Sequence, residues 1–248
     1  MLPKLGLIAV LGLLLTGCAP EAQLSVPGVS VTVNQPQGPQ QVVGSIQLLL
    51  LITVLSLAPA VLILTTGFTR IVIVLSIIRS AIGTPQIPPN QVVVGLALVL
   101  TLFVMAPVWG TIHQEALQPY LQGQIDQQTA ADRAIRPLRA FMLRQTREKD
   151  LSLFLALSNQ PPPATPDDVP TSAIIPAFVI SELKTAFQMG FILFVPFLII
   201  DIVVSSTLLS MGMMMLPPSL VSLPFKLLLF VMVDGWYLVV RSLVMSFH

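Results

Sequence analysis

Residues 210–218 read SMGMMMLPP and join two strongly apolar segments, residues 187–209 and 220–244. This stretch carries four methionines, Met211, Met213, Met214 and Met215, and no charged residue. A loop that returns to water is normally rich in Ser, Asn and Asp, so we expect this one to contact protein or lipid. The flexible thioether of methionine refills a gap that changes shape. Two interpretations follow: filler at the tip of a buried hairpin, which composition alone favours, or a deformable plug.

The whole chain has the composition of a membrane protein. Of its 248 residues, 54% are hydrophobic and 9% are charged, whereas a soluble domain has about 25% charged residues. The net charge of +1 gives no electrostatic reason to expect a nucleic acid. Cys18 is the single cysteine and there are two histidines, which excludes an intrachain disulfide and a cysteine or multi-histidine metal site. We therefore expect no metal and no cofactor.

The N-terminal segment predicts export from the cytoplasm. Residues 1–17 resemble a signal peptide, with Lys4 before an apolar run and then small residues. The sequence LTGC at residues 15–18 also fits the bacterial lipoprotein pattern, in which Cys18 is lipidated; the alternative is an ordinary signal peptide with a chance cysteine. Both place the mature N-terminus outside the cytoplasmic membrane. Residues 18–45 are rich in Pro, Gly and Gln, which predicts a flexible linker.

Residues 46–112 predict a first pair of apolar helices. As one helix, residues 46–78 would extend about 50 Å, well beyond the roughly 30 Å hydrocarbon core. This run is therefore expected to tilt, to break or to lie partly outside the bilayer, with a kink at Pro59. Gly83 is expected to close the first helix in a left-handed cap.

Residues 113–172 form the only polar block, within which residues 130–159 predict an amphipathic helix with Pro137 at an early turn or kink. The block is either a solvated cap on the membrane part or a basic face that binds a partner. Four crossings after a cleaved signal would place it outside. That placement opposes the positive-inside rule, although long loops translocate largely regardless of charge.

Residues 173–248 predict a second apolar pair around the methionine loop, with Pro196 interrupting its first member. Each charge at the centre of a membrane helix costs about 2.5–3.5 kcal/mol, so charges there should face protein, water or one another. In an antiparallel hairpin Asp201 and Lys226 would lie at similar depth and could pair. Asp234 and Arg241 are seven residues apart, on one face of a continuous helix. The charges in or beside the apolar segments are Arg70, Arg79, Glu182, Lys184, Asp201, Lys226, Asp234 and Arg241.

Enzyme motifs are absent from the sequence, which contains no HExxH, GxSxG, GxxxxGK[ST] or GxGxxG. Asp201 and Asp234 on separate apolar helices suggest an intramembrane aspartyl dyad, which needs two carboxylates sharing one proton. Lys226 nearby argues for neutralisation of charge instead. We expect no catalytic activity.

Three long stretches resemble one family. They are GFTRIVIVLS at residues 67–76 with GTPQIPPNQ at 83–91; PAFVISELKTAFQMG at 176–190; and residues 212–236, which contain GMMMLPP, LPFKLLLF and VDGW. Together they resemble the FliP family of flagellar type III secretion export-gate proteins, from about residue 46 to the C-terminus. The signal peptide and the block 113–172 also fit the flagellar branch. The lipoprotein pattern at Cys18 is not part of the family pattern.

The resemblance implies an all-α, membrane-associated subunit whose kinked hairpins assemble into a pore-forming pentamer with FliQ and FliR. In the family this assembly is a helical cone, much of it above the bilayer plane, and the methionine-rich loop is a gasket around the closed pore. Carried onto this chain, the gasket is Met211, Met213, Met214 and Met215. The resemblance also implies a multi-pass protein of the bacterial inner membrane and flagellar basal body that passes unfolded flagellar subunits, driven by the membrane potential and a separate ATPase.

Two alternatives remain beside the export gate. Broken apolar helices with buried charge also suit a secondary transporter for a small solute, although no inverted repeat is visible. A virulence type III secretion homologue of the same gate has similar helices. In the gate hypothesis Glu182, Lys184, Asp201, Lys226 and Asp234 form a buried charge network that holds or switches helix contacts.

Overall fold

The computed structural model describes residues 24–26, 29–31, 39–84, 86–158, 163, 165–213 and 215–247. The expected signal peptide, the lipidation site at Cys18 and the side chain of Met214 lie outside the described residues. The chain divides into two compact units, residues 1–56 and 57–248. The described part is almost entirely helical, which confirms the all-α fold class.

In the first unit, the segment predicted as a linker contains two short strands. β1 (Leu24–Val26) pairs antiparallel with β2 (Val29–Val31), with Leu24 opposite Val31. Helix α2 (Pro39–Thr65) starts in this unit, so residues 39–45 are helical rather than part of a linker. Pro39 stands at the first helical position, where the fixed φ of proline suits the start of a helix.

The long apolar run breaks at a glycine and not at its proline. α2 continues through Pro59 to Thr65, and α3 (Phe68–Ile82) begins after Gly67. A Cβ atom on Gly67 would lie 2.7 Å from the ring of Phe247, so only glycine allows the chain to turn this close to the aromatic ring. As predicted, Gly83 ends α3 in a left-handed conformation with φ +85°.

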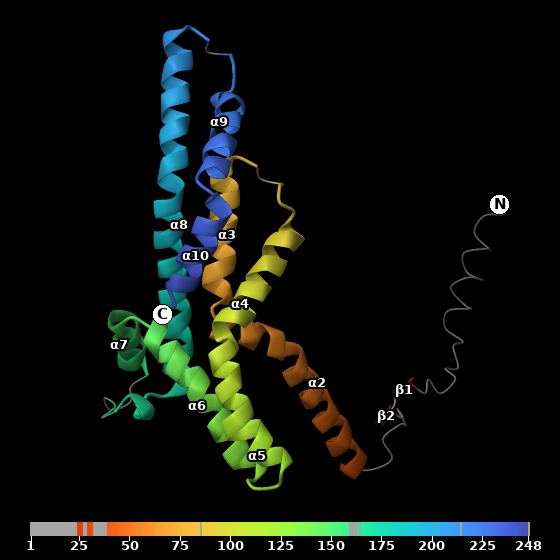
Figure 1. Ribbon diagram of the computed structural model, residues 1–248. Coiled ribbons are helices and arrows are strands. Elements are labelled where there is room, and N and C mark those ends of the chain that lie inside the picture. Colours follow the sequence, from red (N-terminus) through yellow and green to blue (C-terminus); the bar gives the residue numbers. More distant parts are fainter. Residues whose placement is uncertain are drawn as a thin grey trace, which may run out of the picture. The chain divides into compact units, whose positions relative to one another are not determined.

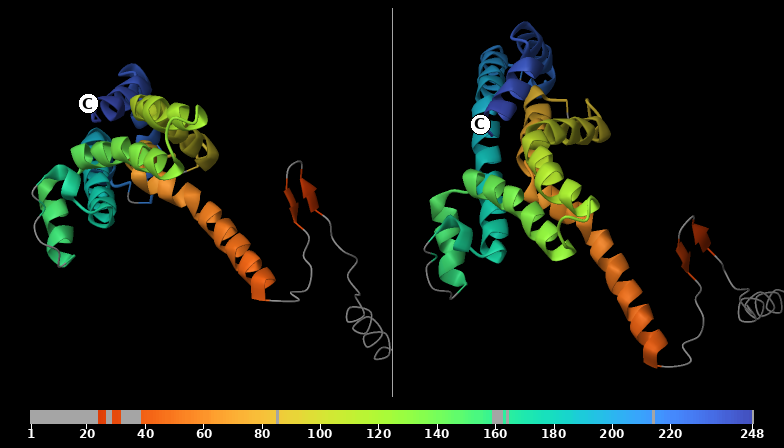
Figure 2. Two further views of the ribbon diagram at one scale, coloured as in Figure 1. Left: turned by 90° about the horizontal axis from the view of Figure 1, so that it is seen from below. Right: turned by 60° about the horizontal axis from the view of Figure 1, so that its bottom comes forward.

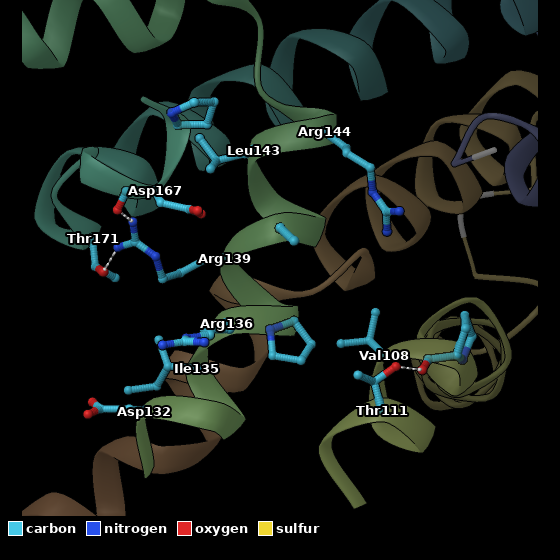
Figure 3. Close-up of a pocket in the computed structure, with 14 residues that line it drawn as sticks. Val108, Thr111, Asp132, Ile135, Arg136, Arg139, Leu143, Arg144, Asp167 and Thr171 are labelled. Atoms are coloured by element: carbon cyan, nitrogen blue, oxygen red, sulfur yellow. Dashed lines mark hydrogen bonds between the residues drawn. The ribbon is translucent and has the colours of Figure 1, made fainter. Parts of the chain in front are cut away.

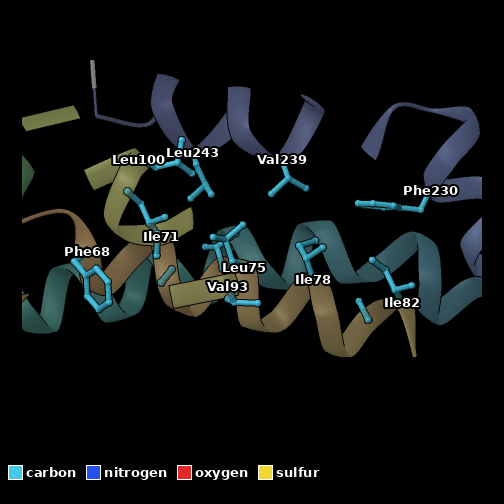
Figure 4. Close-up of a cluster of buried hydrophobic side chains, with 14 of the residues drawn as sticks. Phe68, Ile71, Leu75, Ile78, Ile82, Val93, Leu100, Phe230, Val239 and Leu243 are labelled. Atoms are coloured by element: carbon cyan, nitrogen blue, oxygen red, sulfur yellow. The ribbon is translucent and has the colours of Figure 1, made fainter. Parts of the chain in front are cut away.

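Helix α3 is the centre of the larger hydrophobic core. Its residues Ile71, Val74, Leu75 and Ile78 are buried at helical spacing. Figure 4 shows Ile71, Leu75 and Ile78 together with Val239 and Leu243 of the C-terminal helix α10 (Gly235–Met245). Because these contacts join segments far apart in sequence, the core binds the C-terminal helix to the first apolar pair.

A second core lies beside the polar block. α4 (Asn90–Ile112) continues through a π-helical turn (His113–Leu117) into α5 (Gln118–Leu121), past the predicted end at residue 112. Met105 and Val108 of α4 pack with Phe141 of α6 (Gln127–Gln145) and Phe178 of α8 (Thr171–Ser210). This cluster attaches the polar block to two of the long apolar helices.

The amphipathic helix predicted over residues 130–159 is two helices. α6 runs unbroken through Pro137, and α7 (Glu148–Leu157) follows after Thr146 and Arg147, whose backbones are extended. The backbone N–H of Arg147 donates to Ser181 Oγ at 3.0 Å, and Ser181 Oγ donates to Asp150 Oδ2 at 2.8 Å. A tertiary contact with α8 therefore stabilises this break, and a short 3₁₀ turn, η2 (Pro166–Asp168), leads back to α8.

The longest helix and its return helix form a hairpin. α8 is continuous for 40 residues through Pro176 and Pro196, so the interruption predicted at Pro196 is wrong. α9 (Pro218–Met232) runs back beside the far half of α8, and α6 and α7 lie near the other end (Figures 1 and 2). α9 and α10 are bent by 64° at residues 233–234, where a single helix was expected.

Three described helices are long and apolar enough to cross a membrane, at Leu48–Thr65, Asn90–Leu121 and Thr171–Ser210. The bent pair α9 and α10 counts as a fourth if it forms one span. The helices therefore have the composition of a membrane protein.

Candidate functional site

The methionine loop caps the α8–α9 hairpin through a well-defined turn. Gly212 has φ +76° and donates its N–H to Leu209 O at 3.1 Å, while Met213 N–H donates to Leu208 O at 3.0 Å. This pair of bonds is a Schellman motif, in which a left-handed glycine satisfies the last carbonyls of a helix. Pro218 then opens α9 at a position where its missing N–H costs little.

The described loop methionines are exposed at the tip. Met215 is 99% exposed, Met211 72% and Met213 40%. No charged side chain lies between residues 202 and 225, so the end of the hairpin is apolar on both helices. Within one chain the described methionines of the loop are therefore at most partly covered by other side chains, which differs from the interpretation as filler at the tip of a buried hairpin.

One ion pair connects the two helices of the hairpin. Lys226 Nζ lies 2.6 Å from Asp201 Oδ2, and Ser222 Oγ donates to the other carboxylate oxygen at 2.6 Å. Lys226 and Ser222 are buried, and the side chain of Asp201 is 33% exposed. The pairing predicted from antiparallel depth is confirmed. Asp201 is thereby neutralised by a lysine, so it is not placed to share a proton with Asp234.

A second, deeper ion pair connects α3 to α8. The guanidinium of Arg70 and the carboxylate of Glu182 are both almost fully buried and form two hydrogen bonds, of which Arg70 Nε to Glu182 Oε2 measures 2.9 Å. Arg70 and Glu182 are both among the charges that the sequence places in or beside apolar segments, but the sequence does not predict that they pair with each other. The two residues are 112 positions apart, and no local pattern relates them.

The remaining donors of Arg70 reach the polar block and the end of the chain. Nη2 donates to Gln145 Oε1 at 2.9 Å, and Nη1 donates to Ser246 O at 2.8 Å and to Ser246 Oγ at 3.0 Å. The ring of Phe247 stacks under the guanidinium, with its centroid 4.0 Å from Cζ. Arg70, which belongs to α3, thus contacts α6, α8 and the residues after α10. We call Arg70 and its partners Glu182, Gln145, Ser246 and Phe247 the Arg70 cluster.

The five residues predicted as one charge network do not meet. Glu182 pairs with Arg70 and Asp201 with Lys226, in separate places. Lys184 is exposed and forms no ion pair with any described residue. Asp234 is exposed in a left-handed conformation, φ 51°, before α10. Asp234 is the N-cap residue of α10, the helix that contains Arg241, and the described residues show no ion pair between the two.

The described residues contain no group of three or more His, Cys, Asp or Glu side chains that could hold a metal ion. The arrangement offers charge neutralisation within a helical hairpin and an apolar, deformable tip.

A profile of the FliP family matches residues 51–243. The chain belongs to the FliP family. It is 54% identical to the flagellar biosynthetic protein FliP of Pectobacterium carotovorum over 93% of this chain and 89% of that protein. It is equally identical to FliP of Bacillus subtilis over 88% of this chain and 98% of that protein, and 50% identical to FliP of Aquifex aeolicus over 85% and 89%.

The region that matches the FliP profile contains the methionine loop and both ion pairs. It ends at residue 243, before Ser246 and Phe247. The contacts of Arg70 with the end of the chain therefore lie beyond the matched region, while its contact with Glu182 lies within it.

Proposed function

We propose that this FliP family member is a pore-forming subunit of the flagellar type III protein export gate in the bacterial inner membrane. Its relatives are named flagellar biosynthetic proteins, which supports a role in the flagellar export apparatus. In this proposal unfolded flagellar subunits pass through the pore and the chain itself catalyses nothing. The block 113–172 lies on the periplasmic side.

The observation that carries the proposal is the methionine tip of the hairpin. A loop of exposed thioethers costs free energy in water because each side chain keeps apolar surface hydrated. That cost disappears if several copies bring their tips together on one axis. Methionine suits such a contact because it repacks when the opening widens. Met211, Met213, Met214 and Met215 would then seal the closed pore against ions.

The outer surface of α8 supports assembly with other chains. Phe187, Phe191, Ile192 and Ile202 are each more than half exposed. Lipid covers some of such a surface, and neighbouring copies and the partners FliQ and FliR are proposed to cover the rest. A pentamer is the proposed number of copies.

The proposal is tested by replacing Met213, Met214 and Met215 with Ala and measuring ion leakage through vesicles that contain the assembled complex. Smaller side chains leave a gap at the constriction, so small ions should leak while the complex stays assembled. Met232→Ala with Met245→Ala is the matched control, because both residues are exposed on helices away from the loop. Vesicles that remain tight around a fully assembled triple variant would refute the gasket.

A further inference from the structure

A groove of about 470 Å³ lies on one face of the α8–α9 hairpin, beside the methionine loop. Its walls include Ile199, Val203, Thr207 and Met211 of α8, and Val221 and Phe225 of α9. Thr207 is the one polar residue among the described residues of the lining, and its hydroxyl donates to Val203 O and Val204 O at 2.9 Å. The groove therefore offers an occupant apolar surface and no free side-chain donor.

The opposite face of α8 carries a row of exposed aliphatic side chains. Thr207 marks the side of α8 that faces the groove. An α-helix turns by about 100° per residue, so the positions two after, five before and nine before Thr207 all lie within about 40° of the opposite direction. Leu209, Ile202 and Leu198 occupy these positions, and each is exposed within one chain. We call these three residues the ridge.

The groove and the ridge lie at the same height along the hairpin. On α8 the groove extends from Ile199 to Met211, and the ridge extends from Leu198 to Leu209. Rotation about one axis keeps every atom at its height, so in a ring of hairpins that run along that axis the ridge of one copy faces the groove of the next. Two different faces that meet in this way form a heterologous interface, which closes into a ring, whereas a two-fold dimer joins a face to itself.

A second copy of this chain suits the groove better than an acyl chain does. Met211 lines the groove and also belongs to the methionine loop, so a contact in the groove continues into the seal proposed at the tip. No charged residue lies between residues 202 and 225, so both faces are apolar over this stretch. An acyl chain would cover either face alone, but it gives no reason for a groove and a ridge at one height on opposite faces.

We propose that the ridge of one copy packs into the groove of the next, with Ile202 and Leu209 of one chain against the lining around Thr207 of its neighbour. The inference rests on the proposed pore, because copies whose tips meet on one axis bring these two faces together. Each ridge side chain that enters the groove removes apolar surface from water on both chains, which stabilises the contact between adjacent hairpins. The same contact fixes the position of Met211 at the seal.

The test is disulfide cross-linking of the full-length protein in intact membranes. Thr207→Cys with Leu209→Cys places one thiol in the groove and one on the ridge. The two point to opposite sides of one helix and cannot bridge within a chain, because a disulfide needs Cβ atoms about 3.5–4.5 Å apart. Oxidation should therefore give a ladder of dimers, trimers and larger species on a non-reducing gel, and a reductant should remove it. Each single-cysteine variant should run as a monomer, and it also controls for Cys18, which every variant retains.

A second experiment measures assembly itself. Ile202→Ser with Leu209→Ser should lower the yield of oligomer on a native gel severalfold, because the ridge loses apolar surface. Ile135→Ser with Leu153→Ser is the matched control, since both are exposed aliphatic residues of the polar block. Ile135 lies at a separate groove beside α6, away from the hairpin (Figure 3). The control should assemble as well as the unchanged protein.

Three results would overturn the inference. The first is a complex of several copies in which the double-cysteine variant gives no ladder; lipid or another protein then covers the groove, and the proposed pore still stands. The second is a cross-linked dimer from either single-cysteine variant, which would mean that a face meets itself. The third is an equal yield of oligomer from the ridge variant and its control. A native mass of one copy for the unchanged protein would refute the proposed pore as well.

Discussion

At the scale of single residues, buried charge is handled in two different ways. Arg70 satisfies its donors with a carboxylate, an amide oxygen, a hydroxyl and a carbonyl, and Phe247 covers its face. Lys226 has a single carboxylate partner, which is also bound by Ser222. The Arg70 cluster therefore joins four parts of the fold, whereas the Lys226 pair joins only the two helices of the hairpin.

We expect the losses in the free energy of unfolding caused by changes at Arg70 and Glu182 to be strongly non-additive. Glu182→Leu leaves a buried guanidinium without its counter-charge, and Arg70→Met leaves a buried carboxylate, so each single change should destabilise by about 3–5 kcal/mol. The double variant removes both charges and should lose clearly less than the sum of the two. Thermal unfolding in detergent, followed by circular dichroism, measures all three. Additive losses would show that the two residues do not act as a pair.

Lys226→Ala should reduce the yield of assembled complex severalfold, because Asp201 is left without its counter-charge where α8 and α9 meet. Lys184→Ala is the control, since Lys184 lies on α8 with Asp201 but is exposed and forms no ion pair within the described residues. Native gel electrophoresis of membranes solubilised in mild detergent measures the yield. Equal oligomer yields for the two variants would contradict the importance of the pair.

At the scale of helices, the turns are set by left-handed residues and by packing. Gly212 ends α8 and Gly83 ends α3, both with positive φ. Asp234 does the same between α9 and α10, although a non-glycine residue there is strained. A Cβ on the next residue, Gly235, would collide with the ring of Phe230, so the bend brings the backbone directly against an aromatic side chain.

Asp234→Gly should leave stability unchanged or raise it by about 0.5–1 kcal/mol, since glycine accepts positive φ without strain. Asp234→Val should destabilise by about 1–2 kcal/mol, because a β-branched residue is strongly disfavoured in this conformation. The two unfolding temperatures are compared in the same detergent. A valine variant as stable as the glycine variant would mean that the bend between α9 and α10 is not maintained in solution.

At the scale of the molecule, one chain pairs Arg70 with Glu182 and Lys226 with Asp201 but leaves apolar helix faces and the described methionines of the loop exposed. Burial of apolar side chains drives association, and each fully buried large side chain contributes about 1.5–3 kcal/mol. In mild detergent the protein should therefore have the native mass of several copies, with other small membrane proteins bound. A lone monomer whose loop methionines contact only detergent would contradict the pore and favour a different role.

Much of the candidate site was predictable because its determinants are local. The methionine loop, the helices on either side and the cap at Gly83 follow from composition and from the backbone freedom of glycine. The Asp201–Lys226 pair is predictable because the two residues lie at similar distances from the turn of an antiparallel hairpin. The Arg70–Glu182 pair did not follow, because its members are brought together only when α3 packs on α8.

The sequence by itself determined an all-helical membrane protein, a methionine-tipped hairpin and membership of the FliP family. The tertiary structure alone decided where several helices break. Proline removes a single backbone bond, and an apolar helix survives that loss at Pro59 and Pro196 because little water competes for the bonds that remain. The breaks lie instead at Gly67, at Thr146 and at Asp234. At Gly67 the ring of Phe247, beyond the end of α10, occupies the space where a side chain would lie. After Thr146 the hydroxyl of Ser181 in α8 accepts the N–H of Arg147. At the third break the ring of Phe230 packs against Gly235, the residue after Asp234.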